Sequence, residues 1–376
     1  MASARKLDYI LIITTILLII FGIIILASAS TSVSQIKFGD SYYYLNHQII
    51  FALIPGILLA VLFSRIKLSI VKKWAPVALL LNLVLMTFVF LPGIGIKIGK
   101  GARWISLGIA SFQPSETLKL AFILYIASWL EGKNKKRFSL PKTQKDLKEN
   151  FLAFMMILGL IGLLLWLQSD LGTLAVILAI GVLMYFLADT PLFDTIKIIV
   201  LAGLAFLILI NFSSYHWQRI VVFLNPDIDP MGSGYHMKQA LMAIGSGGLF
   251  GLGFGMSQQE FGFLPHSISD SIFAVLAEEA GFIGSVMLIV LFLLFLWRGF
   301  TIGKQSKNRF SSLAVLGITS WILIQALVNI GAMIGIIPLT GIPLPFISQG
   351  GTALATELAA VGILLNVSRG AKYEKQ

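Results

Sequence analysis

The chain contains an apolar run, Tyr9 to Ala29, that holds no charged residue. An α-helix rises about 1.5 Å per residue and the hydrocarbon core of a bilayer is about 30 Å thick, so this run can cross a membrane as a helix. Lipid offers no hydrogen bonds to the backbone, which leaves helices and closed barrels as spanning structures. A barrel strand alternates apolar and polar residues. Because this run does not alternate, it predicts a transmembrane helix.

Nine further apolar runs follow, several of them shorter than the ~20 residues of a full crossing, so their ends are located only to within a few residues. They lie at 49–63, 75–91, 116–130, 151–167, 171–188, 195–210, 272–297, 312–335 and 351–367. Only 12% of the residues are charged, against about 25% in a soluble domain. No linker or internal repeat interrupts the chain. The sequence predicts an all-α, polytopic membrane protein of about ten transmembrane helices in a single domain, residues 1–376.

The basic residues predict the orientation, because short cytoplasmic loops are enriched in Lys and Arg. With the N-terminus inside, the inner segments hold Arg5, Lys6, Arg65, Lys67, Lys72, Lys73, Lys133, Lys135, Lys136, Arg137, Lys142, Lys145, Lys148, Arg298, Lys304, Lys307, Arg309, Arg369, Lys372 and Lys375. The outer segments hold only Lys37, Lys97, Lys100, Arg103, Arg219 and Lys238. Topology therefore accounts for the net charge of +11, and both termini are expected in the cytoplasm.

Two segments on the predicted outer side are long, Pro92 to Ser115 and Asn211 to Ser271. Long loops without much secondary structure are usually functional or disordered. The second segment joins the seventh and eighth helices and is rich in Gly, Phe and Leu, which argues against disorder. We expect it to pack back onto the membrane surface, with a re-entrant stretch around Ala240 to Phe254.

Charged residues in or beside a span are costly, so each needs a reason. Asp8, at the start of the first span, is expected to cap that helix. Asp270 directly precedes the eighth span, where it could cap the helix or act as a general base at the outer rim of the bundle. Glu278 and Glu279 lie about 12–14 Å deeper on the same helix. They are either a structural pair, bound to Lys119 or to Ser and Asn side chains, or a proton or ion relay.

Two cations have a structural and a functional interpretation each. Lys119 lies three residues after Glu116 and could pair with it on one helix, or could reach an anionic ligand. Arg103 precedes Trp104 on the predicted outer side. Its guanidinium could anchor the chain at the membrane interface or bind a diphosphate, whose oxygens suit a guanidinium fork.

Two other motifs favour a structural interpretation. The glycine-rich stretch from Gly245 to Gly255 lacks the Lys-Ser or Lys-Thr of a nucleotide loop, so it predicts close backbone packing. Asp227 and Asp229 could form a metal-binding pair, but the flanking Pro226 and Pro230 favour a turn. The four histidines have no metal-ligand spacing.

Several motifs occur in a fixed order along nearly the whole chain. They are Gly101 to Ile105 with Gln113 to Glu116 and Lys119; Gln168 to Thr173; Arg219-Ile220, Asp229-Pro230 and Gly234-Tyr235; Ala243 to Gly248; Asp270 to Phe273; Ala277-Glu278-Glu279 with Gly281 to Gly284; and Asn329 to Gly351. The last block, which includes Pro338 to Phe346 and Ser348, is the most specific. In this order the motifs resemble the FtsW/RodA (SEDS) family of peptidoglycan polymerases.

The chain departs from the family pattern at a few positions. They are His266 after Pro265 where the family usually has Glu, Ile268 where many members have His, Ser169 in place of Pro and Gln349 in place of an aromatic residue. None removes Asp270, but they leave open any role for a Glu or His beside it. The Ser-Asp-Ser-Ile-Phe form and Ser28-Ala29-Ser30 resemble the division branch, FtsW, more than RodA.

The resemblance implies a glycosyltransferase that extends a lipid-linked glycan with lipid II outside the membrane and releases undecaprenyl diphosphate. Asp270 matches the family's essential aspartate and is expected to be the catalytic base. The residues expected to bind substrate are Arg103, Trp104, Lys119, Asp170, Arg219, Lys238, Glu278 and Ser348. A divalent cation, Mg²⁺ or Mn²⁺, could assist at the diphosphate. No organic cofactor and no protein metal site are implied.

The resemblance also implies partners and a location. These are a class B penicillin-binding transpeptidase and other division proteins, in the bacterial cytoplasmic membrane at the septum. A lipid II flippase is the main alternative, but transporter sites lie near the midplane, often between repeats. An elongation-type polymerase and a scaffold remain as further alternatives, although a scaffold would need neither Asp270 nor the outer cations.

Overall fold

The computed structural model describes residues 7–98, 101–108, 110–134, 144–188, 190, 192–257 and 264–370. The helices are α1 Tyr9–Phe38, α2 Tyr43–Gln48, η1 Ile49–Leu53, α3 Ile54–Arg65, α4 Leu68–Phe88, α5 Pro114–Asn134, α6 Gln144–Leu167, α7 Leu171–Leu187, α8 Leu192–Asn211, α9 Ser214–Leu224, η3 Pro226–Ile228, α10 Ser233–Ser246, α11 Ile272–Gln305, α12 Arg309–Met333 and α13 Gly351–Gly370. The strands are β1 Gly95–Ile98, β2 Gly101–Ser106 and β3 Ser111–Phe112.

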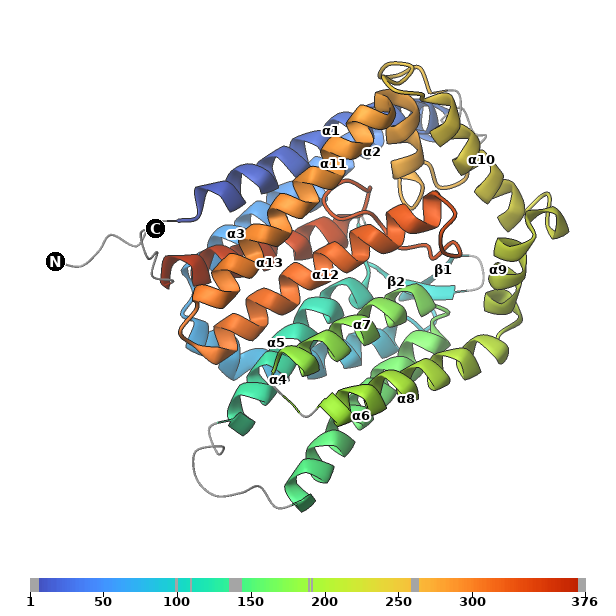
Figure 1. Cartoon of the computed structure of the whole chain (residues 1–376). Coiled ribbons are helices and arrows are strands. Elements are labelled where there is room, and N and C mark those ends of the chain that lie inside the picture. Colours follow the sequence, from blue (N-terminus) through green and yellow to red (C-terminus); the bar gives the residue numbers. More distant parts are fainter. Residues whose placement is uncertain are drawn as a thin grey trace.

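Each of the ten predicted spans lies largely within helical structure, which confirms a polytopic membrane fold. Seven of the described helical stretches are long and apolar enough to cross a bilayer, and α6 and α7 add shorter apolar helices. The remaining span, α5, carries more charge and packs against α4 and α12. In Figure 1 the start of α1 and the end of α13 lie at the same end of the bundle, as expected when both termini share one side of the membrane.

The start of α1 is held as predicted. The Oδ1 atom of Asp8 accepts a hydrogen bond of 3.0 Å from the backbone N–H of Leu11, which caps the helix. The same buried carboxylate also pairs with Arg298 near the C-terminal end of α11. Asp8 therefore fastens α1 to α11 as well as capping α1.

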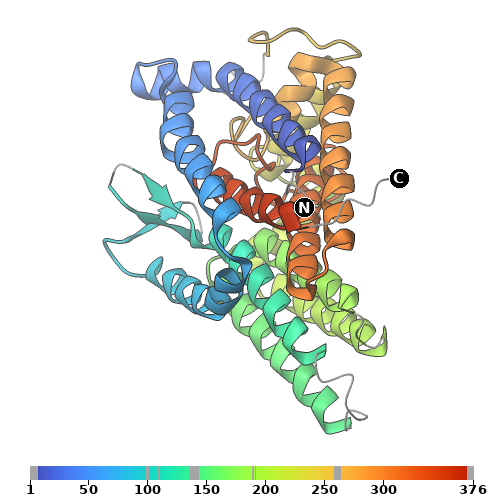
Figure 2. The same ribbon diagram turned by 90° about the vertical axis from the view of Figure 1, so that its left-hand side faces the viewer.

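The two long predicted loops contain regular structure that the sequence did not indicate. The strands β1, β2 and β3 form an antiparallel sheet in that order, which projects from one end of the bundle (Figure 2). The segment 211–271 contains α9 and α10, which lie at the same end as the sheet (Figure 1). We call this end of the bundle the sheet end, and the end that carries the termini the terminal end.

The glycine-rich stretch after α10 packs against a break in α11. Gly281 interrupts α11 with a φ of 66°, and the freed carbonyl of Glu278 accepts a bond of 2.9 Å from the N–H of Leu252. A methyl group on Gly251 would lie 2.0 Å from the carbonyl oxygen of Glu279, so only glycine fits there. The prediction of close backbone packing is confirmed, and the stretch is not a nucleotide loop.

The segment 334–350 between α12 and α13 is irregular, yet most of residues 342–348 are buried among the helices (Figures 1 and 2). Side chains supply its backbone with hydrogen bonds. Gln325 donates to the carbonyl of Pro343 at 3.0 Å, Asn329 donates to that of Ile342 at 2.8 Å, Glu357 accepts from the N–H of Phe346 at 2.8 Å, and Ser348 accepts from that of Leu344 at 2.7 Å. Polar side chains thus replace the water that this backbone lacks.

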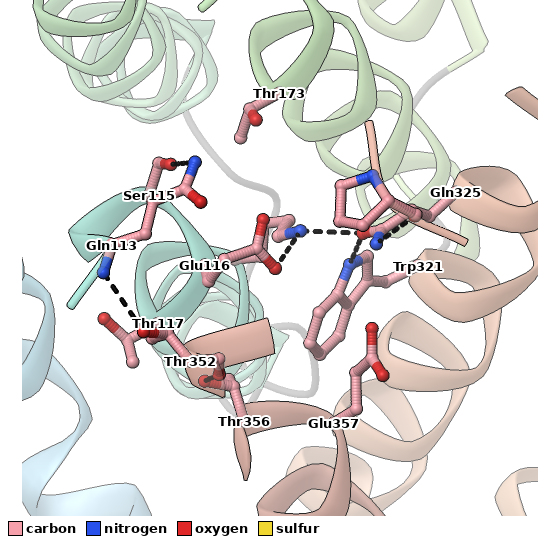
Figure 3. A network of polar contacts seen from close by, with 12 residues as sticks. Gln113, Ser115, Glu116, Thr117, Thr173, Trp321, Gln325, Thr352, Thr356 and Glu357 are labelled. Atoms are coloured by element: carbon pink, nitrogen blue, oxygen red, sulfur yellow. Dashed lines mark hydrogen bonds and ion pairs between the residues drawn. The ribbon is translucent and has the colours of Figure 1, made fainter. Parts of the chain in front are cut away.

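One of these side chains belongs to a buried ion-pair network. The Nζ atom of Lys119 lies 2.7 Å from Oε2 of Glu116 and donates a second bond of 2.7 Å to Oε1 of Gln325. Trp321 also donates to Oε1 of Gln325, at 2.7 Å. Figure 3 shows Glu116, Gln325 and Trp321 pointing toward one another from α5 and α12. The network orients the Gln325 amide toward Pro343 and so fastens the segment 334–350 to α5.

Topology can be tested directly, because the chain contains no cysteine. Met231, which is 91% exposed at the sheet end, and Lys307, exposed between α11 and α12, suit single-cysteine variants. In intact cells we predict that a membrane-impermeant thiol reagent labels Met231→Cys and labels Lys307→Cys only after lysis. The reverse pattern would place the sheet end in the cytoplasm.

The network also predicts a stability effect. Lys119→Met should destabilise the protein by about 3–5 kcal/mol, because Glu116 would stay buried without its counter-ion. Adding Glu116→Gln should recover most of that loss, since neither charge then remains. Unfolding in detergent measures both effects. Equal stability of the single and double variants would show that the ion pair is not what holds this region.

Candidate active site

Asp270 lies at the sheet end, in the short segment that leads into α11. Ser271 rather than Asp270 occupies the N-cap position of α11, so the helix-capping interpretation of Asp270 is wrong. The carboxylate faces Gly341 of the segment 334–350. A methyl group in place of a Gly341 hydrogen would lie 3.4 Å from Oδ2 of Asp270 and 3.9 Å from Nη1 of Arg219. An acid and a cation therefore face the same point of the backbone.

Arg219 extends from α9 and is partly buried. Its Nη1 atom donates a hydrogen bond of 2.8 Å to the carbonyl of Leu339, two residues before Gly341. This bond fixes the guanidinium against the same segment that approaches Asp270. A planar guanidinium held in this way can present its other N–H groups to phosphate oxygens.

The surroundings of Asp270 disfavour its charged form. Part of the residue reaches the surface, but the protein removes most of its hydration, which raises the pKa of the carboxyl above its usual range. Positive charge on His266, Arg219 and Arg103 opposes this pKa shift. Ser269 opposes it too, through a side-chain hydrogen bond. A carboxylate with a raised pKa is a stronger base once it is ionised.

Arg103 and Asp170 meet at the turn between α6 and α7. The guanidinium of Arg103, on β2, donates to the carbonyls of Gln168 and Ser169, and its Nη1 lies 3.8 Å from Oδ1 of Asp170. Protein carbonyls thus hold Arg103, which argues against the interfacial-anchor interpretation. Asp170 caps α7 and also accepts a bond of 3.2 Å from Ser115. Trp104 follows Arg103 on β2 and is partly exposed.

Three histidines, His216, His236 and His266, lie beside Asp270 or beside the arginines that act on it, and sequence reasoning assigned none of them to the site. The Nε2 atom of His236 lies 2.6 Å from the hydroxyl of Ser271, which itself donates to the carbonyl of Pro265 at 2.9 Å. Since a hydroxyl has one hydrogen, Nε2 of His236 must be the donor in this contact. The ring of His266 is exposed, with its centroid 6.2 Å from that of His236.

Two of these histidines have a lowered pKa, which favours neutral rings at pH 7. Loss of hydration, together with the positive charges of Arg219 and Arg103, lowers the pKa of His216 to about 4, while Asp170 opposes this shift. Loss of hydration also lowers the pKa of His236 to about 4, with smaller effects from His266 and Arg219. Neutral rings add no positive charge to that of Arg219 and Arg103.

The structure does not bring every candidate residue to this site. Lys119 is 1% exposed and bound to Glu116 and Gln325 inside the bundle, as the local-pair interpretation predicted. Lys238 pairs with Asp227 at 2.5 Å. It lies two residues after His236 on α10, and residues two apart on a helix do not share a face.

Glu278 and Ser348 have structural partners. Glu278 is buried in α11 and accepts hydrogen bonds from the hydroxyls of Ser257 and Ser246. Its neighbour Glu279 accepts one from Ser28 at 2.5 Å. The predicted serine partners are therefore present. Ser348 donates 2.6 Å to the carbonyl of Ser269 and so supports the segment that carries Asp270.

The residues present do not build a protein metal site. Across the described ranges no three His, Asp or Glu side chains converge in a way that could hold an ion. Asp229, one of the candidate pair, instead accepts a bond from the N–H of Ser233 and closes the turn before α10, as predicted. The divalent cation expected from the resemblance is therefore assigned no ligands, and no step below depends on it.

Comparisons with known proteins bear on this arrangement. Residues 8–373 match the cell cycle protein family of FtsW, RodA and SpoVE. Stage V sporulation protein E of Bacillus subtilis is 38% identical over 371 residues, which cover 97% of this chain and 98% of that protein. A Coxiella burnetii protein named probable peptidoglycan glycosyltransferase FtsW is 37% identical over 361 residues, 95% of each chain.

Solved structures share the fold over almost the whole chain. A chain of a peptidoglycan synthase complex that coordinates polymerization and crosslinking superposes with a TM-score of 0.77 at 27% identity, covering 98% of this chain and 99% of that one. RodA, the rod shape determining protein of Thermus thermophilus, superposes with a TM-score of 0.71 at 26% identity and the same coverage. The chain therefore belongs to the FtsW/RodA/SpoVE family.

Proposed function

We propose that this chain is a peptidoglycan glycosyltransferase that polymerises lipid II at the sheet end of the bundle. The observation that carries the proposal is the position of Asp270. Its carboxylate faces the Gly341 backbone together with the guanidinium of Arg219, at the end where Arg103 is also fixed. The Coxiella burnetii relative that is named a probable glycosyltransferase supports the same reaction class.

The reaction is a displacement at an anomeric carbon. The 4-hydroxyl oxygen of the lipid II N-acetylglucosamine forms a bond to the anomeric carbon of the lipid-linked chain. The bond from that carbon to the diphosphate oxygen breaks, and undecaprenyl diphosphate leaves with the electron pair. Asp270 takes the hydroxyl proton as general base. Negative charge develops on the leaving diphosphate, where fixed guanidinium groups stabilise it.

The arrangement suggests distinct roles for the surrounding side chains. Arg219 lies against Asp270 and is the foremost candidate for the leaving diphosphate. Arg103, on β2, is the second candidate cation for the diphosphate, and its ion pair with Asp170 orients it. Trp104 is a candidate contact for a sugar ring or lipid chain beside Arg103. Lys119 is placed in the internal network rather than at the diphosphate.

The flippase alternative would need polar groups that are open to a passing headgroup inside the bundle. The buried carboxylates that the structure describes there have protein partners. Glu116 pairs with Lys119, and Glu357 accepts from the N–H of Phe346. Glu278 binds serine hydroxyls. These contacts favour structural roles and support the enzyme.

Partner and location follow from the relatives. The first structural neighbour is part of a complex that coordinates polymerization and crosslinking, which supports a class B penicillin-binding transpeptidase as partner. The FtsW-named relatives support a role in septal wall synthesis at the bacterial cytoplasmic membrane, with other division proteins. A RodA-like role in elongation is the alternative within the family.

The purified chain, assayed with lipid II and a class B transpeptidase, tests the reaction. We predict that the wild type makes glycan polymer and that Asp270→Asn makes none, at least 100-fold less, in line with the loss of a general base. Asn has nearly the shape of Asp, so the variant should fold and bind lipid II normally.

Two outcomes would count against this proposal. A loss of only a few-fold in Asp270→Asn would show that another group takes the proton, and Asp170 would be the next carboxylate to test. A wild type that binds lipid II in the complex but makes no polymer would refute the proposed activity itself.

The raised pKa of Asp270 predicts the pH dependence. The base acts when ionised, so polymerisation should fall as the pH drops through a pKa above the usual range of Asp. Arg219 lowers that pKa, so Arg219→Gln should move the acid limb of the rate profile to higher pH, besides slowing the reaction.

Arg369→Gln provides a matched control for this measurement. Nη1 of Arg369 also donates to a backbone carbonyl, that of Ser64 at 3.1 Å, but it does so near the terminal end. The acid limb of the rate profile of Arg369→Gln should therefore coincide with that of the wild type. An unshifted limb in Arg219→Gln would mean that Arg219 does not act on the group that titrates.

A further inference from the structure

One side chain on α12 joins the two segments that form the active site. The Nδ2 atom of Asn329 donates a hydrogen bond of 2.8 Å to the backbone carbonyl of Asp270 and another of 2.8 Å to that of Ile342. Asn329 is 1% exposed. A primary amide nitrogen carries two hydrogens, so both donors are committed to these two carbonyls.

The other half of this amide indicates that the two donors are the reason for its position. The Oδ1 atom of Asn329 is buried and has no hydrogen-bond partner among the residues that the structure describes. A buried acceptor without a partner is destabilising. A hydrophobic residue of the same size would avoid that cost but would leave the carbonyls of Asp270 and Ile342 without these donors. What asparagine provides is a paired contact to Asp270 and Ile342.

The two carbonyls are the ones that set the geometry of the site. Ile342 directly follows Gly341, whose backbone faces both the Asp270 carboxylate and the Arg219 guanidinium. Arg219 is itself bound to the carbonyl of Leu339, in the same segment. Fixing Ile342 relative to Asp270 therefore also fixes the cation relative to the base.

Two other hydrogen bonds join the segment 334–350 to the residues just before Asp270. Ser348 donates to the carbonyl of Ser269 at 2.6 Å, and the N–H of Gln349 donates to the carbonyl of Ile268 at 2.9 Å. Neither reaches Asp270 or the backbone next to Gly341. Asn329 supplies the contact to the backbone of Asp270 itself and to the residue next to Gly341.

We propose that Asn329 is a positioning residue for the glycosyl transfer, holding Asp270 and the Gly341 backbone in register so that base and cation act on one substrate. The inference rests on the proposed function. Among the described residues, the hydrogen bonds of Asn329 go to backbone carbonyls and not to the side chains of Asp270 or Arg219. Its loss should therefore impair the chemical step more than substrate binding.

The test is Asn329→Leu, which keeps the approximate volume and removes both donors. For the complex with a class B transpeptidase we expect kcat for lipid II polymerisation to fall about 10- to 100-fold, as for a catalytic group displaced by about 1 Å. KM should stay within about twofold of the wild type. Replacing a purely structural residue would lower the amount of folded enzyme but would leave the kcat of the folded enzyme unchanged.

The pH profile gives a second readout. The charged groups that act on Asp270 are His266 beside it, Arg219 on α9 and Arg103 on β2. His216 on α9, His236 on α10 and Asp170 at the start of α7 lie around these groups. None of them is changed in Asn329→Leu. Loosening the two segments should admit water to Asp270, which lowers its pKa, so the acid limb should move to lower pH.

Asn366→Leu is the matched control. Nδ2 of Asn366, on α13, also bridges two backbone carbonyls, those of Phe63 and Ile66, at 2.7 and 2.6 Å. Asn366 lies in the last turns of α13, the end of which is at the terminal end of the bundle (Figure 1), whereas Asp270 belongs to the sheet end. Asn366→Leu should lose stability in the same way as Asn329→Leu but keep the wild-type kcat and acid limb.

The inference would be overturned if Asn329→Leu kept the wild-type kcat and the acid limb of the wild-type pH profile. It would also be overturned if Asn329→Leu and Asn366→Leu lost kcat to the same extent. If Asn329→Leu does not fold, Asn329→Ser decides, because its hydroxyl restores one donor. Wild-type kcat and acid limb in folded Asn329→Ser would then overturn the inference, and an intermediate kcat would support it. A wild type that makes no polymer would refute the proposed function instead, so the two failures are distinguishable.

Discussion

Lipid provides no hydrogen-bond partner for a peptide group, so irregular backbone inside a membrane protein must be satisfied by protein. The segment 334–350 meets this condition through Gln325, Asn329 and Glu357, whose bonds are directional and come from three different places on α12 and α13. The glycine-rich stretch after α10 meets it by pairing with the broken backbone of α11. Because these bonds exist only in one arrangement, they hold both segments in place, and the Asp270 carboxylate faces the first of them at Gly341.

The same constraint separates two uses of charge in this fold. Inside the bundle Lys119 meets Glu116, and the pair serves to orient the amide that holds Pro343. At the sheet end Arg103 and Arg219 donate to backbone carbonyls, and both guanidinium groups lie on partly exposed residues. Lys119 is 1% exposed and its ammonium lies 2.7 Å from Glu116. This difference in exposure explains why the arginines, rather than Lys119, suit a leaving diphosphate.

Sequence reasoning predicted the ten spans and the family, because apolar runs and ordered motifs are local signals. It also predicted the Asp8 cap, and it gave the Glu116–Lys119 pair as one of two interpretations of Lys119; both depend on spacing along one helix. It missed the small sheet, α9 and α10, whose short elements are specified by packing at the sheet end. It also missed the histidines, because isolated histidines from different elements have no spacing to recognise. Asn329 stood at the start of the most specific motif block, but only the fold shows that its amide reaches Asp270.

The central claim is that the Asp270 carboxylate removes a proton from the attacking hydroxyl, and chemical rescue tests it most directly. Asp270→Ala removes the carboxylate and leaves space for a small one beside Arg219. The account predicts that added formate restores lipid II polymerisation in this variant saturably, and that it does not stimulate the wild type. An Asp270→Ala variant that binds lipid II normally but stays inactive at every formate concentration would contradict the claim and assign the proton to another group.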